Sequence, residues 1–529
     1  MNSNIKFFLT ISLGIIYTSR SIAQNALINP IQFREMNRIN QLVNPTAPTL
    51  SWYDSTHPFL FASTIQNNTK LPVGYNDGAM QPAVGLRQYY TIGFRKQWKK
   101  WTLQLQPEIV MAENKKPDGL PDGFYAPNYW YRYYEKKINV IDQPDYNPQG
   151  PTTKFYPGQS KLEFTHKNFS AAISTENLWW GPGVYNSLVL TNNSPGFPHI
   201  RLGTHKPIQT KIGAITAEAI FGQLYNSNIE PPENQNPNGS PFYVPKINET
   251  RFITGMQISW QPKWIPNISV GLINMGNQYN KDISGFDFLP LANFWKRSTR
   301  NALGSLFVRY QMPKDHAEIY LEYGRNDKAP FITNIVGDSI AMGFVLGVRK
   351  AVLLNSNKGA IVLHVELTQL HLQNARLLWV QENPALPSKT SSWYTHDYVR
   401  QGYTNDGKVL GASIGPGSNS QIIGINWVKQ LNRIGIQFER VSQNNDYYFY
   451  NYFNGLPFQG PNFLYWADVH LSFNARFAWR NFLFAAELKN TKAINYKWVK
   501  FGNGGLWDPA PLSDKKNQQV TFSILYRFP

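Results

Sequence analysis

Two stretches of the chain gather side chains of the kinds that bind sugars. Aromatic rings stack on the C–H faces of a sugar, and planar amide, guanidinium and hydroxyl groups bond to its hydroxyls. The first stretch, ENLWWGPGVYNSLVLTNNSPGFPHIRLG, spans residues 176–203, and the second spans residues 393–419. Together they supply the candidate sugar-binding residues, which are Asn177, Trp179, Trp180, Asn192, Asn193, His199, Arg201, Trp393, Tyr394, His396, Tyr403 and Asn419.

Each stretch contains a Gly-Pro-Gly corner, at residues 181–183 and 415–417. Glycine and proline cannot continue a helix or a regular strand ladder there, so we expect the rings to sit on stiff, turn-rich loops. Such loops would hold the rings ready for a ligand. The alternative is that Trp179 and Trp180 are anchors in the core or at a membrane interface, and the sequence leaves both interpretations open.

Catalytic and metal-binding patterns are weak by comparison. The sequence has no cysteine, which excludes disulfides, thiolate metal sites, a cysteine nucleophile and a lipid anchor on an N-terminal cysteine. It has no phosphate-binding loop, no dinucleotide fingerprint after a strand and no Gly-x-Ser-x-Gly elbow. Glu318 and Glu322 could form the carboxylate pair of a glycosidase, but an ion-paired interior explains them better. We therefore predict no catalytic residue, no metal site and no cofactor.

The elements that must position these loops alternate with period two. In residues 316–323, Ile319, Leu321 and Tyr323 alternate with Glu318, Tyr320 and Glu322, and the last such run ends at Phe528. Repeated runs of this kind with aromatic ends are typical of a transmembrane β-barrel, whereas a soluble sandwich or propeller would not need the terminal aromatics. We predict an all-β, antiparallel outer-membrane barrel of about 18 strands. Its expected interior charges include Glu318, Glu322, His364, Glu366, Arg433, Glu439, Asp468, Arg476 and Arg527. Charges of opposite sign, such as Arg433 and Glu439, are expected to pair there.

The N-terminus predicts export. Lys6, an apolar run at residues 7–17 and the small-x-small site at residues 21–23 are the three parts of a signal peptide, so we expect residues 1–23 to be removed. No later segment offers about 20 apolar residues for a transmembrane helix. Helical spacing in residues 30–43 predicts one short amphipathic helix. We assign residues 24–86 to an N-terminal helical, periplasmic segment and residues 87–529 to the barrel with its long loops.

The long non-alternating segments and the net charge suggest the partner. Residues 111–128, 229–250, 381–420 and 444–462 are expected on the extracellular side or folded into the lumen. The formal charge is +18, and loss of Lys6 and Arg20 with the signal peptide leaves +16. Such a surface attracts anions. For an exported protein these are acidic polysaccharide or lipopolysaccharide rather than nucleic acid, although a solvated basic face remains an alternative.

The two loop motifs resemble those of the Wzi family of capsule-assembly outer-membrane proteins. The resemblance rests on NLWWGPGVYNSLVLTNNSPGFPHI at residues 177–200, on WYTHDYVRQGYTNDGKVLGASIGPGSN at residues 393–419, and on the order of signal peptide, short helix and strands. It extends over nearly the whole mature chain and is closest to a Bacteroidota-type member. It implies an 18-stranded barrel that acts as a non-catalytic lectin and attaches capsular or extracellular polysaccharide to the cell surface. The alternatives are a channel for a small solute and, third, an outer-membrane hydrolase.

Overall fold

The computed structural model describes the chain in several ranges. These are residues 30–44, 57–117, 133–231, 239, 241–290, 293, 298–326, 341–355, 358–371, 392–453, 466–498 and 514–528. The signal peptide at residues 1–23 and much of the expected long loops lie outside the described residues.

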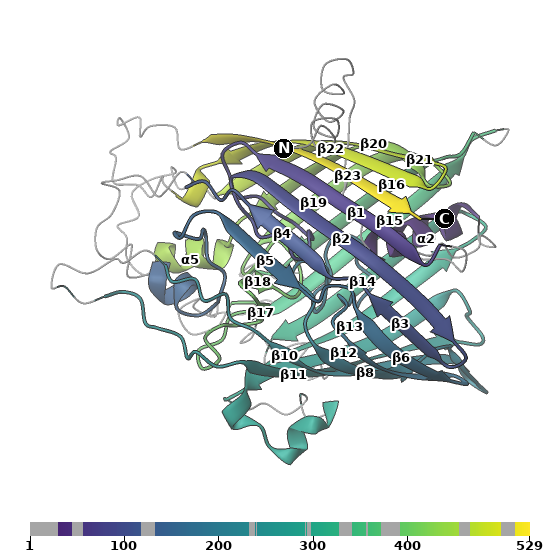
Figure 1. The fold of residues 1–529 in the computed structure, drawn as a ribbon, viewed down its shortest axis with the longest axis horizontal. Coiled ribbons are helices and arrows are strands. Elements are labelled where there is room, and N and C mark those ends of the chain that lie inside the picture. The colour runs from purple at the N-terminus through teal and green to yellow at the C-terminus, as the bar shows by residue number, and fades with distance from the viewer. Residues whose placement is uncertain are drawn as a thin grey trace, which may run out of the picture.

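The described strands form one closed antiparallel barrel (Figure 1). Three crossings of the wall are each split into two segments (β3 with β4, β5 with β6, β8 with β9), so the 21 described segments make 18 wall strands. β1 closes the ring by pairing with both β2 and β23. The wall segments are β1 (Phe59–Asn68), β2 (Gly85–Trp98), β3 (Trp101–Leu105), β4 (Glu108–Ala112), β5 (Thr152–Tyr156), β6 (Lys161–His166), β7 (Phe169–Ser174), β8 (His199–Thr204), β9 (Ile208–Thr210), β10 (Gly213–Leu224), β11 (Arg251–Pro262), β12 (Ile268–Tyr279), β13 (Asn301–Met312), β14 (Ala317–Asn326), β15 (Met342–Leu353), β16 (Ala360–Gln369), β19 (Asn419–Lys429), β20 (Asn432–Ser442), β21 (Ala467–Trp479), β22 (Phe482–Ile494) and β23 (Lys515–Arg527).

The period-two pattern places polar residues inside the barrel and apolar residues outside, as predicted. On β14, Ile319 and Leu321 are exposed on the outer face, while Glu318 and Glu322 are buried in the bore. The same alternation appears on β20, where Ile434 and Ile436 face outward. Because successive side chains of a strand point to opposite faces, one polar and one apolar face follow directly from the sequence.

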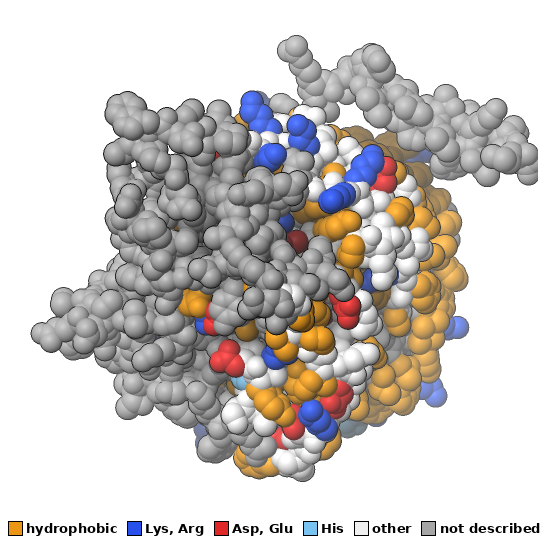
Figure 2. All heavy atoms as spheres, turned by 90° about the vertical axis from the view of Figure 1, so that its left-hand side faces the viewer, with side chains coloured by type: hydrophobic (Ala, Val, Ile, Leu, Met, Phe, Trp, Pro, Cys, Tyr) orange, Lys and Arg blue, Asp and Glu red, His pale blue; other side chains and the backbone are white. Residues whose placement is uncertain are grey.

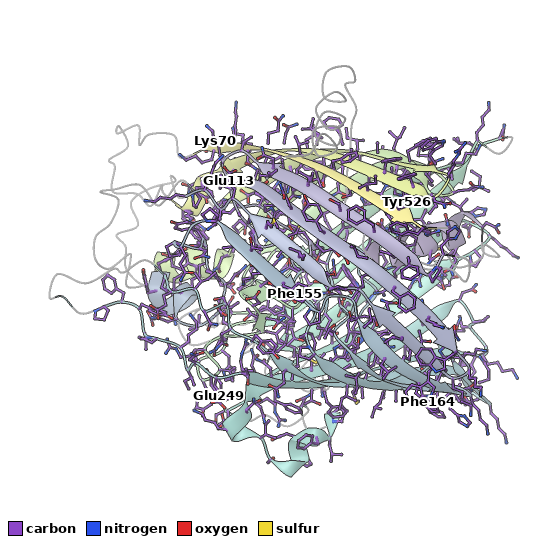
Figure 3. The ribbon with its side chains drawn as sticks, viewed as in Figure 1. Lys70, Glu113, Phe155, Phe164, Glu249 and Tyr526 are labelled. Carbon is purple, nitrogen blue, oxygen red and sulfur yellow. The ribbon has the colours of Figure 1, made fainter. Side chains whose placement is uncertain are left out.

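The outer surface is built to contact lipid. Hydrophobic side chains cover the visible flank of the wall in Figure 2. Trp98, Trp101, Trp264 and Trp479 are exposed at the strand ends near the short turns, where an aromatic girdle of a membrane barrel is expected. In Figure 3, Phe164 and Tyr526 lie toward this end, whereas Lys70, Glu113 and Glu249 lie toward the other. None of the helices in the described ranges is long and apolar enough to cross a membrane.

The two ends of the barrel differ in the length of their connections. At one end the strands are joined by short turns, such as the two residues between β19 and β20 or between β21 and β22. At the other end the connections are long, and the one between β16 and β19 spans residues 370–418. Outer-membrane barrels have short periplasmic turns and long extracellular loops, so we call the two ends periplasmic and extracellular.

The helix predicted at residues 30–43 is confirmed as α2 (Pro30–Val43). It lies within the barrel at the periplasmic end, close to the end of β23 (Figure 1), instead of outside it. Its apolar side chains pack on the wall: Phe33 contacts the cluster of Leu60 and Leu525, and Ile39 contacts that of Val362 and Val428. The helix is buried there because its apolar stripe meets lumen-facing apolar patches at this end of the wall.

The expected boundary between N-terminal segment and barrel at residue 87 is corrected by β1. This strand, at Phe59–Asn68, lies inside the segment assigned to residues 24–86, yet it is part of the wall. Its Phe59, Phe61 and Ile65 alternate with buried Leu60, Ala62 and Thr64, which is the period-two pattern of a wall strand. The barrel therefore begins at Phe59, since the ring would be open without β1.

Candidate functional site

The first motif enters the bore as a loop between β7 and β8, where two wall carboxylates hold its backbone. Glu366 on β16 accepts hydrogen bonds from the backbone N–H groups of Val184 (2.7 Å), Tyr185 (3.1 Å) and Asn186 (2.7 Å). Glu322 on β14 accepts from the Ser187 hydroxyl at 2.9 Å and from the Leu188 N–H at 3.2 Å. The lumen-facing acids thus fix the loop across the bore, because each carboxyl group accepts several buried hydrogen bonds from it.

The Gly-Pro-Gly corner at residues 181–183 is required by close packing. Gly181 has φ +102°, a conformation that favours glycine, and an added Cβ would overlap the Ser187 hydroxyl. At Gly183 an added Cβ would overlap the backbone carbonyl of Asn186. Both glycines therefore let the chain fold tightly back on itself, so the predicted turn at this corner is confirmed.

The second motif packs directly on the first. The Tyr394 hydroxyl donates to the Leu188 carbonyl at 2.7 Å and accepts from the Ala412 N–H at 2.7 Å. Thr191 and Asn193 bond to the carbonyls of Gly411 (2.6 Å) and Val409 (2.9 Å). A short hairpin of β17 (Thr404–Asn405) and β18 (Lys408–Val409) lies within this second loop. The two motifs lie about 200 residues apart in the sequence, but they form one body with a common hydrophobic core.

Helix α2 closes the bore against this body from the periplasmic side. Arg34 donates to the carbonyls of Trp179 (2.8 Å) and Gly181 (3.1 Å), and Arg38 donates to that of Pro182. Glu35 pairs with Arg349 at 3.0 Å and with Arg433 at 3.3 Å.

The charge state of Glu35 follows from these neighbours. Burial alone would raise its pKa, but Arg433, Arg349 and Arg476 together lower the pKa of Glu35 to about 2. The helix is therefore tied to the wall by an ionised carboxylate throughout the physiological pH range.

Most of the rings expected to stack on sugar are structural in this conformation. Trp180, Trp393, Tyr394 and Tyr403 are all at most 2% exposed. The indole N–H of Trp180 donates to Glu218 at 2.7 Å, and Tyr394 stacks on Tyr403. The burial of Trp180 fits the anchor interpretation, and Trp393, Tyr394 and Tyr403 are buried in the same way, so none of the four offers an accessible face for stacking in this conformation.

The remaining candidates divide between wall contacts and loop turns. Asn177 donates to the Ser194 carbonyl at 2.7 Å, and buried His199 bonds to the Phe197 carbonyl. Arg201 pairs with Glu163 at 2.8 Å. His396 accepts the N–H groups of Tyr398 and Val399 and so shapes its own turn. Asn419 bonds to His371.

Trp179 and Asn192 line a small interior cavity between α2 and the two loops. Its volume is about 80 Å³, and Arg34, Tyr75 and Lys489 also line it. The Trp179 ring is half-buried, and the Arg34 guanidinium lies 6.0 Å from its centre. The helix, the loops and the barrel wall all line this cavity, and its volume suits water or small solutes rather than a polymer.

One expectation about an interior ion pair is corrected. Arg433 and Glu439, both on β20, were expected to pair, but Arg433 pairs with Glu35 and the cation near Glu439 is Lys489. The favoured interpretation of Glu318 as part of an ion-paired interior is confirmed, while Glu322 is hydrogen-bonded instead. Glu318 binds Arg38 (2.8 Å) and Arg309 (2.6 Å), while Glu322 bonds to Ser305, Ser187 and Leu188. Helix α2 supplies two of these partners, Glu35 and Arg38, and the alternation of the strands alone could not predict them.

A larger cavity opens at the extracellular end, above the packed loops. Its volume is about 200 Å³, and half-exposed rings, lysines and amides line it. Among the predicted site residues, Asn193 lines it. The aromatic, charged and amide side chains that also line it include Tyr75, Lys136, Lys137, Asp145, Tyr146, Asn147, Lys154, Lys408, Gln443, Trp466, Asp468, Tyr496, Lys497 and Trp498.

Sequence reasoning missed this cavity. Its described residues come from seven separate connections and from strand ends, and only the run Tyr496-Lys497-Trp498, which interleaves rings with a cation, was a local sign of it.

Comparison with known proteins decides the family. The family model described as capsule assembly protein Wzi matches residues 84–480, which is about three quarters of the chain. The chain belongs to the Wzi family. The matched region contains both loop motifs and Trp466, but neither α2 nor Lys497.

Solved structures give the fold of this Wzi-family protein. Wzi of Escherichia coli, an outer-membrane carbohydrate-binding β-barrel involved in group 1 capsule assembly, has a TM-score of 0.56 at 13% identity, with 95% of this chain and 89% of that chain covered. OccK5 (OpdH) of Pseudomonas aeruginosa has a TM-score of 0.40 at 9% identity, covering 89% and 97%. OccAB2 of Acinetobacter baumannii has a TM-score of 0.43 at 10% identity, covering 89% and 98%. No curated protein sequence matches significantly.

Proposed function

We propose that this Wzi-family barrel binds exported capsular or extracellular polysaccharide and attaches it to the cell surface. One observation carries the proposal. The bore is filled by α2 and the two packed loops, while a cavity lined by rings, lysines and amides faces the extracellular end. The carbohydrate-binding barrel of E. coli, which functions in capsule assembly, supports the same role.

A channel for a small solute is the second candidate, and the filled bore speaks against it. Wall carboxylates that would line an aqueous channel are engaged with loop backbone or with arginines instead. The same engagement argues against a hydrolase, since Glu318 and Glu322 make structural contacts and are not poised around a substrate. We therefore propose a non-enzymatic role with no cofactor.

The proposed ligand is acidic. The mature charge of +16, which follows from the formal charge of +18, attracts polyanions at the surface. Figure 2 shows Lys and Arg side chains gathered near the extracellular rim. Lipopolysaccharide and other outer-membrane lipids are the proposed surroundings of the wall, because its exterior is apolar with an aromatic girdle.

The experiment compares polysaccharide on cells and in the medium. Cells that lack the protein should shed their polysaccharide, and the parent chain supplied in trans should restore attachment. Trp466→Ala should restore it poorly although the barrel reaches the outer membrane. The lipid-facing Ile436→Ala is the control and should restore attachment fully. Equal retention by cells with and without the protein would contradict the proposal.

A further inference from the structure

The extracellular cavity contains a cation pair bridged by one carboxylate. Lys137 Nζ lies 2.6 Å from one oxygen of Asp145, and Lys497 Nζ lies 3.5 Å from the other. We call these three residues the lysine cradle. They come from the connection between β4 and β5 and from the one between β22 and β23, so the fold brings them together from far apart in sequence. The cradle carries two positive charges and one negative charge.

The surplus positive charge lies in the cradle itself. The described lining residues include five lysines, but Lys136, Lys154 and Lys408 pair with Glu135, Asp406 and Asp77. Burial would raise the pKa of Asp145, but Lys137 and Lys497 hold that pKa well below its usual range. Asp145 is therefore ionised and neutralises one of its two lysines, which leaves a surplus positive charge in the cradle.

A ring stands beside the cradle. Trp466 is half-buried, lines the cavity and meets Tyr496 and Trp498 edge-on, at ring-centre distances of 5.0 and 4.9 Å. Its indole N–H donates to Asp468 at 2.8 Å. These contacts fix the Trp466 ring without covering it. Lys497 lies in the sequence between Tyr496 and Trp498, the two rings that hold Trp466. A flat apolar face beside a cation is the combination that recognises a charged sugar.

The backbone that presents Lys497 is held in an uncommon conformation. Lys497 and Trp498 both have φ +55°, the left-handed region that favours glycine. The Trp498 N–H donates to the Asn495 carbonyl at 2.9 Å, and Trp498 is buried against Tyr447. A non-glycine residue keeps such a conformation only when its surroundings enforce it, and this often happens where a side chain is aimed at a ligand.

We propose that the lysine cradle and Trp466 form a subsite for one carboxylate-bearing sugar residue of the polysaccharide, a hexuronate or its equivalent. This inference rests on the proposed function and names the part of the ligand that the cavity selects. The sugar ring stacks on Trp466, and its carboxylate bonds to Lys137 and Lys497. The amide side chains of Asn147 and Gln443 also line the cavity.

The test uses two forms of one polymer. The probe is the acidic polysaccharide fraction extracted from the producing cells, used as isolated and after chemical reduction of its carboxyl groups to alcohols. Binding is measured by calorimetry on the purified full-length barrel in detergent. The parent should bind the native form at least tenfold more tightly than the reduced form, which is about 1.4 kcal/mol.

Single variants separate the cradle from the ring. Lys137→Gln and Lys497→Gln each leave Asp145 with one lysine, so no carboxylate is orphaned and the surplus charge is zero. Each should lose about tenfold affinity for the native polymer and none for the reduced one. Trp466→Ala should weaken binding of both the native and the reduced polymer, and Trp466→Phe should recover part of the loss.

Lys314→Gln, in an exposed periplasmic turn, is the control, since it makes the same change in net charge and should bind like the parent. Folding is checked by heat-modifiable migration in gels, and Lys137→Gln carries the test if Lys497→Gln fails to fold.

The outcomes are distinct. If the parent binds the native and reduced polymers equally, or if both lysine variants bind as Lys314→Gln does, the cradle is not the subsite although polysaccharide binding stands. An extracted polymer that contains no carboxylated sugar would also rule out the cradle as the subsite. If the parent binds neither polymer, the proposed function itself is contradicted.

Discussion

At the residue scale, the motif residues mostly hold the loops together. The rings of Trp180, Trp393, Tyr394 and Tyr403 form a core inside the bore. The sequence predicted that these residues belong together and that the corner at residues 181–183 is stiff. It could not predict which ring faces a cavity, because loops have no period that assigns faces as the alternation of a strand does.

Trp179 and Trp180 should behave differently although they are adjacent. Trp180→Ala should destabilise the barrel by about 3 kcal/mol, as expected when a buried aromatic side chain is removed. Trp179→Ala should cost clearly less, since the ring is half-buried at the interior cavity. The urea concentration at which heat-modifiable migration is lost measures both. Equal effects of the two changes would mean that the difference in burial has no energetic consequence.

The corner glycine Gly183 should not tolerate a methyl group. Gly183→Ala would place its Cβ against the Asn186 carbonyl, so the loop must shift, at a cost of about 1–3 kcal/mol. Gly285→Ala is the matched control, because nothing lies within 4 Å of the added Cβ there. The same unfolding assay should show a loss for the first variant and none for the second. A Gly183→Ala variant as stable as the parent would show that the corner can accommodate a methyl group without strain.

At the element scale, the strands and α2 were predictable and their docking was not. Period two and period 3.6 identify the elements from local sequence. The interior ion pairs link α2 to strands about 300 residues away, as in Glu35 with Arg349 and Arg38 with Glu318. The expected pair of Arg433 with Glu439 is wrong because α2 lies inside the barrel, where its Glu35 pairs with Arg433.

The docking of α2 should depend on pH only in strong acid. Because the pKa of Glu35 is lowered to about 2 in the folded protein, its contribution to docking is complete above its ordinary pKa of 4.5 and is lost as the pH falls toward about 2. The chain has no cysteine, so a spin label at Gln41→Cys, an exposed position of α2, reports on the helix alone. The label should keep its mobility from pH 8 to pH 5.

Glu35→Gln provides the matching test of the ion pairs. It leaves Arg433 without its carboxylate partner and Arg349 with Glu318 alone, at 3.8 Å, which costs about 3 kcal/mol in a buried site. The label should then be mobile at pH 7. A label whose mobility rises between pH 8 and pH 5 in the parent, or stays low in Glu35→Gln, would contradict the proposed attachment of α2.

At the scale of the whole molecule, the barrel class followed from the sequence, and its contents required the structure. The alternation on β14 and β20 sets a polar inside and an apolar outside for any closed sheet. Whether the inside holds water or protein depends on how residues 176–198, residues 392–418 and α2 meet there. No single segment carries that information, since it arises from contacts such as Glu366 with Val184 and Tyr394 with Leu188.

If α2 and the two loops fill the bore from both sides, the barrel is a binding surface and not a channel. Single-channel currents recorded from the purified protein in a planar lipid bilayer test whether the bore is filled. We expect no steady conductance. Large, stable, ohmic steps from the parent protein would contradict a filled bore and would favour the channel.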